Sequence, residues 1–205
     1  MTGGEVHLWL VELDAEREPP AEPLSTAERE RAERLRDPAA GRRWATSRWA
    51  LREVLGRYLG QAPGAVALAL GEHGKPELAG ERPGLEFNLS HSGDLALVAV
   101  AGAAVGVDVE RIDPDRDFLS LAKRALDGEA VEAIASSPEE LRAAAFYAAW
   151  TAHEARLKCG GGGFGGPAPA PELTAVTVAV GGGYAAAYAV AGERPRERRY
   201  RLDLR

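Results

Sequence analysis

Residues 146–158 read F-Y-A-A-W-T-A-H-E-A-R-L-K, and the rest of the chain is organised around them. At helical spacing, one side of this segment looks built to pack and holds Phe146, Trp150, His153 and Leu157. An adjacent side, which we call the acting side, carries polar groups suited to binding or catalysis and holds Tyr147, Thr151, Glu154 and Lys158. A glutamate and a lysine four residues apart are also typical of a solvated salt bridge worth about 0.2–0.5 kcal/mol. The segment alone therefore leaves a surface helix and a functional helix both open.

Two other stretches favour the functional reading, F-N-L-S-H-S at 87–92 and V-G-V-D-V-E at 105–110. The second predicts a strand whose valines share one face, so Asp108 and Glu110 both point to the other face. Two such carboxylates on a strand are by themselves typical of a solvated surface. With a third from a helix, such as Glu154, they can supply hard oxygen ligands to Mg²⁺ that keeps waters for a phosphate substrate.

Composition predicts a globular protein of one domain or two closely packed halves. The chain has 205 residues, of which 45% are hydrophobic and 27% charged. No apolar run approaches the ~20 residues that a membrane span needs, and the first residues lack the pattern of a secretory signal. The single cysteine, Cys159, allows no disulfide within the chain. We expect a cytoplasmic protein that does not enter a membrane.

The charge balance argues against general affinity for nucleic acid, because 25 Lys and Arg face 31 Asp and Glu, a formal charge of −6. Any anion site must therefore be local. Arginines crowd the segment 29–57 on two predicted helices. We interpret most of them as a solvated surface and expect one or two to be phosphate ligands.

The pattern of start, stop and turn signals predicts helices mixed with antiparallel hairpins. Ser25 and Glu28 form a capping box that opens a helix to about Arg36, and Asp37-Pro38 opens another to about Leu59. Strands 85–89 and 95–101 flank a tight polar connection at 90–94. Further strands are expected at 6–13, 66–70, 105–110, 173–180 and 184–190, and a helix with Ser137 as its N-cap at about 138–159, while 194–205 is a last strand or a tail.

This order is not a regular alternation of strands and helices, so the predicted fold class is α+β. Each half offers a long helix beside a few short strands. We therefore predict two similar lobes, residues 1–102 with the arginine-rich helices and residues 103–205 with the carboxylates and the central helix.

Taken together, the stretches resemble the 4′-phosphopantetheinyl transferases, in particular their larger, surfactin-synthetase-activating (Sfp-like) class. The matching segments are G-K-P at 74–76, F-N-L-S-H-S, V-G-V-D-V-E, and W-T-A-H-E-A-R-L-K at 150–158 against the family's W-x-x-K-E-x-x-x-K. The resemblance covers about residues 24–165. It implies a pseudo-twofold pair of α+β lobes in one chain, with coenzyme A bound between them.

The resemblance implies transfer of the phosphopantetheine arm from coenzyme A to a serine of a carrier protein, which releases adenosine 3′,5′-bisphosphate. Asp108, Glu110 and Glu154 would hold Mg²⁺ against the pyrophosphate. Glu154, directly or through a water, would take the serine proton, a role that competes with metal binding. Lys158 would bind phosphates and offset charge on the departing bisphosphate.

The remaining implied contacts lie on the nucleotide side of coenzyme A. They are Lys75, Ser90 and His91, with Arg43, or otherwise Arg42, as the phosphate-binding arginine. His153 departs from the family pattern, which has lysine before the glutamate. Either the histidine packs with its polar end at the rim, or phosphate affinity is lost near neutral pH because a neutral imidazole carries no charge. The glycine-heavy run 160–166 leaves the acceptor side of the site open.

The implied partner is an acyl or peptidyl carrier domain of a polyketide, non-ribosomal peptide or fatty acid synthase, including those of secondary-metabolite biosynthesis. We hypothesise that a local basic patch that includes Arg29, Arg31 and Arg34 meets this domain. The family resemblance suggests a monomer. Two other functions stay open: a Mg²⁺-dependent hydrolase of nucleotide pyrophosphates, and a non-catalytic module that binds coenzyme A or the carrier.

Overall fold

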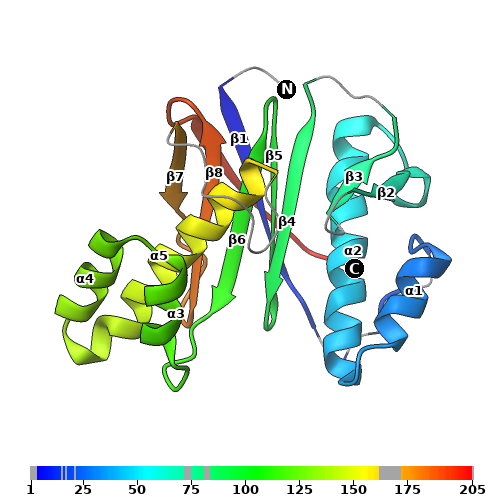
Figure 1. The fold of residues 1–205 in the computed structure, drawn as a ribbon. Coiled ribbons are helices and arrows are strands. Elements are labelled where there is room, and N and C mark those ends of the chain that lie inside the picture. Colours follow the sequence, from blue (N-terminus) through cyan, green and yellow to red (C-terminus); the bar gives the residue numbers. More distant parts are fainter. Residues whose placement is uncertain are drawn as a thin grey trace.

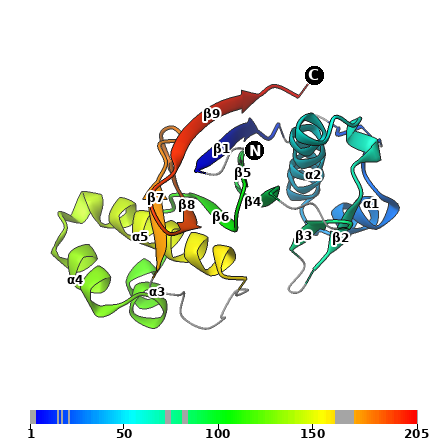
Figure 2. The same ribbon diagram turned by 90° about the horizontal axis from the view of Figure 1, so that it is seen from above.

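The computed structural model describes residues 4–14, 16, 18–20, 22–71, 75–80, 84–161 and 172–204. Figures 1 and 2 show central strands with helices α1 (Thr26–Glu33) and α2 (Pro38–Leu59) on one side. Helices α3 (Phe118–Ala125), α4 (Gly128–Ser136) and α5 (Glu139–Cys159) lie on the other side. The chain therefore places its two long helices, α2 and α5, on opposite flanks of the strands.

The first sheet is built mostly from the first half of the chain. Its strands are β1 (Glu5–Glu12), β4 (Glu86–Ser92), β5 (Leu95–Ala101) and β9 (Arg196–Leu202), in the order β4-β5-β1-β9. β1 is antiparallel to β5 and parallel to β9, so the arginine-rich end of the chain is a strand and not a tail. Helix α2 packs on this sheet through Leu51, Val54 and Leu55.

The second sheet comes from the second half of the chain. It orders β6 (Val105–Arg111), β8 (Tyr184–Ala191) and β7 (Leu173–Thr177) as β6-β8-β7, with antiparallel pairs. Buried residues of both sheets, among them Leu97 and Tyr188, form one shared core. Helix α5 covers the other face of the second sheet, where Ala155 packs on Ala187 and Ala189.

Each half thus has a sheet with one long helix against it, and the α+β class predicted from the sequence is confirmed. The predicted boundary between two lobes at residues 102 and 103 stays a prediction. Strand β9 lies in the second half of the chain but completes the first sheet, so the sheets do not divide the chain at one point. A short helix η1 (Pro63–Ala65) leads into a small hairpin of β2 (Leu68–Leu70) and β3 (Pro76–Leu78). No described helix is both long and apolar enough to cross a membrane.

The predicted helix starts are confirmed for α1 and α2 but not for α5. Ser25 and Glu28 form the reciprocal capping box, and the Asp37 side chain accepts from the Ala39 N–H. At α5 the N-cap is Pro138, because the Ser137 hydroxyl instead donates to the Ala133 carbonyl at the end of α4. Pro138 provides no side-chain cap.

Three predicted strand boundaries were also wrong. The strand predicted at 173–180 ends earlier, since β7 covers only Leu173–Thr177. β4 continues through Ser92, so Ser90 and His91 lie on the strand and not in the turn. The predicted strand 66–70 is shorter, since η1 takes residues 63–65 and pairing with β3 begins only at Leu68.

Candidate functional site

Strands β4 and β6 meet side by side at the junction of the two sheets, and side chains of β4 bridge them. The Asn88 side-chain oxygen accepts from the Val107 N–H at 3.0 Å. The Ser90 hydroxyl donates to Asp108 Oδ1 at 2.8 Å, and the Ser92 hydroxyl donates to Glu110 Oε2 at 2.7 Å. We call these contacts the β4–β6 seam. They join F-N-L-S-H-S to V-G-V-D-V-E and confirm that both carboxylates of β6 point the same way.

Helix α5 reaches this seam because Gly106 lets it lie directly on β6. A Cβ atom at Gly106 would stand 2.0 Å from the Ala155 carbonyl oxygen and 2.4 Å from the Cys159 nitrogen. This close approach brings the Lys158 ammonium 2.6 Å from Asp108 Oδ1 and 3.2 Å from the Ser90 oxygen. Three stretches that are far apart in the sequence thus converge on one buried carboxylate.

Most of the polar side of α5 is buried, like the packing side, and Lys158 is its partly exposed member. Glu154 is 7% exposed and Thr151 is fully buried, with its hydroxyl donating to the Tyr147 carbonyl of its own helix. The predicted division into a packing side and an acting side is therefore too simple. Of the acting side, Glu154 and Lys158 face the carboxylates, while Tyr147 belongs to the core with Phe146.

Burial and mutual repulsion shape the charge of the carboxylates. Burial raises the pKa of Glu154, and the negative charge of Asp108 raises it further, against the opposing effect of Lys158. Burial also raises the pKa of Glu110, which the hydrogen bond from Ser92 partly offsets. These electrostatic couplings place Asp108, Glu110 and Glu154 in one neighbourhood that favours a cation.

The carboxylate oxygens of Asp108, Glu110 and Glu154 have the chemistry that a hard divalent cation requires, although they do not stand close enough to surround one together. Oδ2 of Asp108 is buried and has no hydrogen-bond partner, so one carboxylate oxygen at the seam is left for another group. All three carboxylates offer oxygen, the ligand type that Mg²⁺ takes. In the described part of the chain, no three His, Cys, Asp or Glu side chains stand close enough to hold a metal ion together.

His91 lies on β4 between the two serines that contact the carboxylates. Solvent reaches this residue, yet the surrounding protein desolvates its imidazole, and the positive charges of Arg48 and Lys158 act in the same direction. Together they lower the pKa of His91 to about 4. The imidazole is therefore neutral near pH 7 and sits in a positive environment.

Arg48 is a candidate that the sequence analysis did not single out. Its guanidinium lies over the Trp44 ring, 4.9 Å from the ring centre, and Arg31 approaches the same ring at 5.7 Å. Its charge acts on His91. The spacing of Trp44 and Arg48, four residues apart on one helix, is the sequence signal that could have found this pair.

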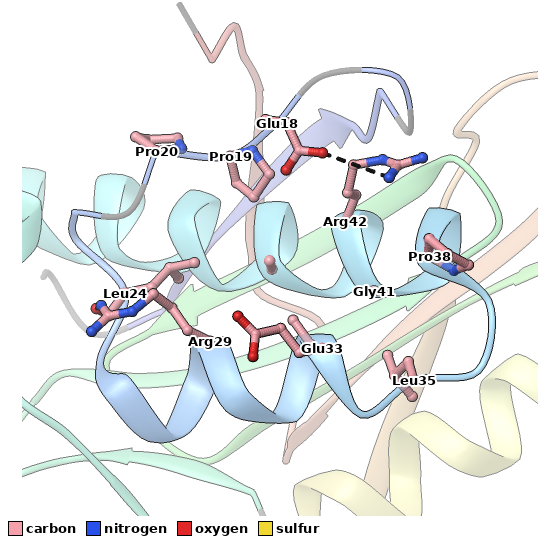
Figure 3. A pocket seen from close by; sticks show the side chains of 12 residues that line it. Glu18, Pro19, Pro20, Leu24, Arg29, Glu33, Leu35, Pro38, Gly41 and Arg42 are labelled. Carbon is pink, nitrogen blue, oxygen red and sulfur yellow. Dashed lines mark hydrogen bonds and ion pairs between the residues drawn. The ribbon is translucent and has the colours of Figure 1, made fainter.

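The two predicted phosphate-binding arginines have intramolecular partners. Arg43 Nε donates to Asp94 Oδ1 at 2.7 Å, at the turn between β4 and β5. Arg42 lies 3.6 Å from Glu18 and lines a separate cavity of about 380 Å³ between α1, α2 and residues 18–20 (Figure 3). Figure 3 shows Arg42 reaching toward Glu18 at this cavity, which none of the seam residues line.

Lys75 stands on the hairpin of β2 and β3, with Gly74 of the G-K-P segment outside the described residues. Burial raises the pKa of Cys159, and the positive charge of Lys75 opposes this shift. The charge of Lys75 thus acts on the last residue of α5. Residues 162–166 of the glycine run also lie outside the described residues.

His153 is half-buried and lies among charges other than those of the seam. Burial lowers its pKa, and Arg156 adds to this effect while Asp127 at the start of α4 opposes it. This position favours the packing interpretation of the histidine over a phosphate contact.

The arginines of the hypothesised carrier-binding patch also have internal contacts. Arg29 donates to the Leu24 carbonyl and to Thr26, Arg34 pairs with Glu30 at 3.8 Å, and Arg31 lies over Trp44. The patch stays a hypothesis.

Comparison with known proteins points to one family. A sequence model of the 4′-phosphopantetheinyl transferase superfamily matches residues 104–198. The 4′-phosphopantetheinyl transferase HetI of Nostoc sp. is 42% identical over 78% of this chain and 70% of its own length. AcpT of Salmonella typhimurium is 42% identical over 54% of this chain and 56% of its own length. The protein psf-1 of Bacillus pumilus is 31% identical over 68% of this chain and 59% of its own length. Both are also named 4′-phosphopantetheinyl transferases.

Proposed function

Because this chain belongs to the 4′-phosphopantetheinyl transferase family, we propose that it transfers the 4′-phosphopantetheine arm of coenzyme A to a serine of a carrier protein. The observation that carries this proposal is the convergence of Ser90 and Lys158 on the buried Asp108, whose negative charge also acts on the buried Glu154. The arrangement offers carboxylates for a cation, an ammonium for phosphate oxygens and a candidate base in one place.

In the proposed reaction, the serine oxygen bonds to the phosphorus on the pantetheine side of the pyrophosphate. The bond from that phosphorus to the bridging oxygen breaks, and adenosine 3′,5′-bisphosphate leaves. Glu154 takes the serine proton, directly or through a water, a role that competes with holding Mg²⁺. In the metal-free protein its raised pKa makes it a stronger base than an ordinary glutamate. Bound Mg²⁺, held by Asp108, Glu110 and Glu154, would supply positive charge to the pyrophosphate and the leaving group.

Lys158 is proposed to bind the phosphates while staying beside Asp108. Its side chain is 29% exposed, whereas that of Asp108 is 4% exposed, so the ammonium is the member of the pair that a ligand can reach. An ammonium at this place offsets the charge that develops on the departing bisphosphate.

The nucleotide side is proposed to include His91, Ser90 and Lys75, as the family resemblance implies. We add Arg48, because its positive charge acts on His91 and its guanidinium is held over Trp44. Arg43 remains a proposed ligand that would have to share its guanidinium with Asp94. A neutral His91 still donates one N–H to a phosphate oxygen.

We further propose that the chain acts like the surfactin-synthetase-activating class, on acyl or peptidyl carrier domains of polyketide, non-ribosomal peptide or fatty acid synthases. The contribution of both halves of the chain to the site supports this proposal: Ser90 comes from the first half, and Asp108 and Lys158 come from the second.

Release of adenosine 3′,5′-bisphosphate from coenzyme A tests this function against its two alternatives. The protein is incubated with coenzyme A and Mg²⁺, with and without a purified apo-carrier domain. A transferase releases bisphosphate only when carrier is present, a pyrophosphate hydrolase releases it without carrier, and a binding module releases none. Release without carrier, or no release with several carriers, would contradict the proposal.

A further inference from the structure

The hydroxyl of Ser92 is held between the backbone and a carboxylate of β6. It accepts a hydrogen bond from the Arg111 N–H at 3.1 Å and donates its own hydrogen to Glu110 Oε2 at 2.7 Å. The hydroxyl therefore accepts from the backbone of β6 while its hydrogen is used in the bond to Glu110. Ser92 can therefore set the position of one carboxylate oxygen.

The turn that follows Ser92 is fixed from both halves of the protein. The Asp94 N–H donates to the Tyr184 hydroxyl at 3.0 Å, and Asp94 Oδ1 accepts from Arg43. Gly93 has a φ of +54°, and a Cβ there would stand 2.6 Å from the Tyr184 oxygen. The residues that follow Ser92 at the end of β4 are thus anchored to both halves of the protein.

The other two side chains of β4 in the β4–β6 seam, Asn88 and Ser90, make different contacts. Asn88 accepts from a backbone N–H of β6 and so joins the two strands without touching a carboxylate. Ser90 contacts Asp108 at Oδ1, the same oxygen that Lys158 binds, and Lys158 also lies 3.2 Å from the Ser90 hydroxyl. Glu110, in contrast, has Ser92 as the hydrogen-bond partner that the structure shows for its carboxylate.

We propose that Ser92 is a positioning residue for Glu110, which it orients as an oxygen ligand for a divalent cation at the β4–β6 seam. The inference rests on the proposed function in so far as Glu110 is taken as a metal ligand. Residues that orient a ligand in this way typically contribute tenfold to hundredfold in metal affinity.

Binding of Mn²⁺, a paramagnetic probe in place of Mg²⁺, tests the role by electron paramagnetic resonance on the full chain. Ser92→Ala should lower Mn²⁺ affinity about tenfold or more and raise the Mg²⁺ concentration for half-maximal transfer. Ser92→Thr keeps a hydroxyl and should restore affinity to within about threefold of the wild type. Ser136→Ala, at an exposed serine that donates to its own helix, is the matched control and should change neither quantity.

Thermal unfolding of the same proteins separates positioning from general stability. Equal Mn²⁺ affinities for wild type and Ser92→Ala, no Mn²⁺ binding by the wild type, or an equal loss of affinity in Ser92→Thr would overturn the inference. So would a loss of Mn²⁺ affinity in Ser92→Ala that is explained by partial unfolding at the assay temperature. Normal Mn²⁺ behaviour in a protein that never modifies a carrier would leave the inference standing and overturn the proposed function.

Discussion

The ammonium nitrogen of Lys158 lies 2.6 Å from Oδ1 of Asp108, so a lysine on α5 neutralises a nearly fully buried carboxylate on β6. This pair ties the helix to the strand that carries the candidate metal ligands. In the protein without metal, Lys158 provides the positive charge that the buried Asp108 requires.

Replacing Lys158 with an uncharged residue should show how much its ammonium group contributes to stability. Lys158→Met removes the charge and leaves Asp108 buried without it, so we expect a loss of about 1–3 kcal/mol in the free energy of unfolding. Mg²⁺ should raise the melting temperature of the variant more than that of the wild type, because the metal takes over the missing charge. Lys123→Met on the exposed face of α3 is the control. Equal shifts with Mg²⁺ in both proteins would contradict the expectation.

The raised pKa of Glu154 predicts a pH dependence of stability. A glutamate whose pKa is higher in the folded than in the unfolded protein binds more protons when folded, so stability falls as the pH rises from the ordinary glutamate range through the raised pKa. Glu154→Gln should remove this contribution and stabilise the metal-free protein by about 0.5–2 kcal/mol at pH 7, while abolishing transfer. Urea unfolding of both proteins between pH 4 and 8 measures this contribution to the free energy of unfolding. A Gln variant less stable than the wild type at pH 7 would contradict this reading.

Arg48 should matter for coenzyme A and for the titration of His91. Arg48→Gln is expected to weaken coenzyme A binding about tenfold, the typical effect of losing one charge-assisted hydrogen bond. The pKa of His91 should rise from about 4, since a neighbouring positive charge is removed. Calorimetry measures the affinity for coenzyme A, and NMR titration measures the pKa of His91. Arg57→Gln, whose guanidinium lies over Trp9 instead, should change neither; an unchanged affinity in Arg48→Gln would remove Arg48 from the site.

Gly106 should be intolerant of any side chain. Gly106→Ala forces a methyl group into the α5 backbone, so we expect a loss of about 1–3 kcal/mol or more and a helix displaced from the carboxylates. Gly128→Ala is the matched control, because a Cβ there meets no atom within 4 Å. Comparable melting temperatures for the two variants would show that α5 does not depend on the close approach.

Local sequence signals predicted those parts of the fold that depend on neighbouring residues. Alternation along β6 placed Asp108 and Glu110 on one side, and the capping box of Ser25 and Glu28 marked the start of α1. Such features follow from strand and helix geometry alone. The parallel pairing of β9 with β1 joins the two ends of the chain, and no local pattern encodes it.

The candidate site was harder to predict where distant residues compete for the same group. Arg43 matched a phosphate ligand in sequence, but its pairing with Asp94 depends on how α2 packs beside the turn between β4 and β5. Ser137 has the right residue type for an N-cap, yet its hydroxyl satisfies a carbonyl of α4. In both cases the fold supplied a partner that the sequence order did not show.

Intact-mass analysis of an apo-carrier domain, after incubation with this protein, coenzyme A and Mg²⁺, tests the proposed transfer most directly. We predict a mass gain of one phosphopantetheine group with the wild-type protein, and no gain without Mg²⁺ or with Glu154→Gln, which should nevertheless fold and bind coenzyme A. An unmodified mass across several carriers, in the presence of a wild-type protein that binds coenzyme A, would contradict the transferase function. A full mass gain with Glu154→Gln would contradict the role of Glu154.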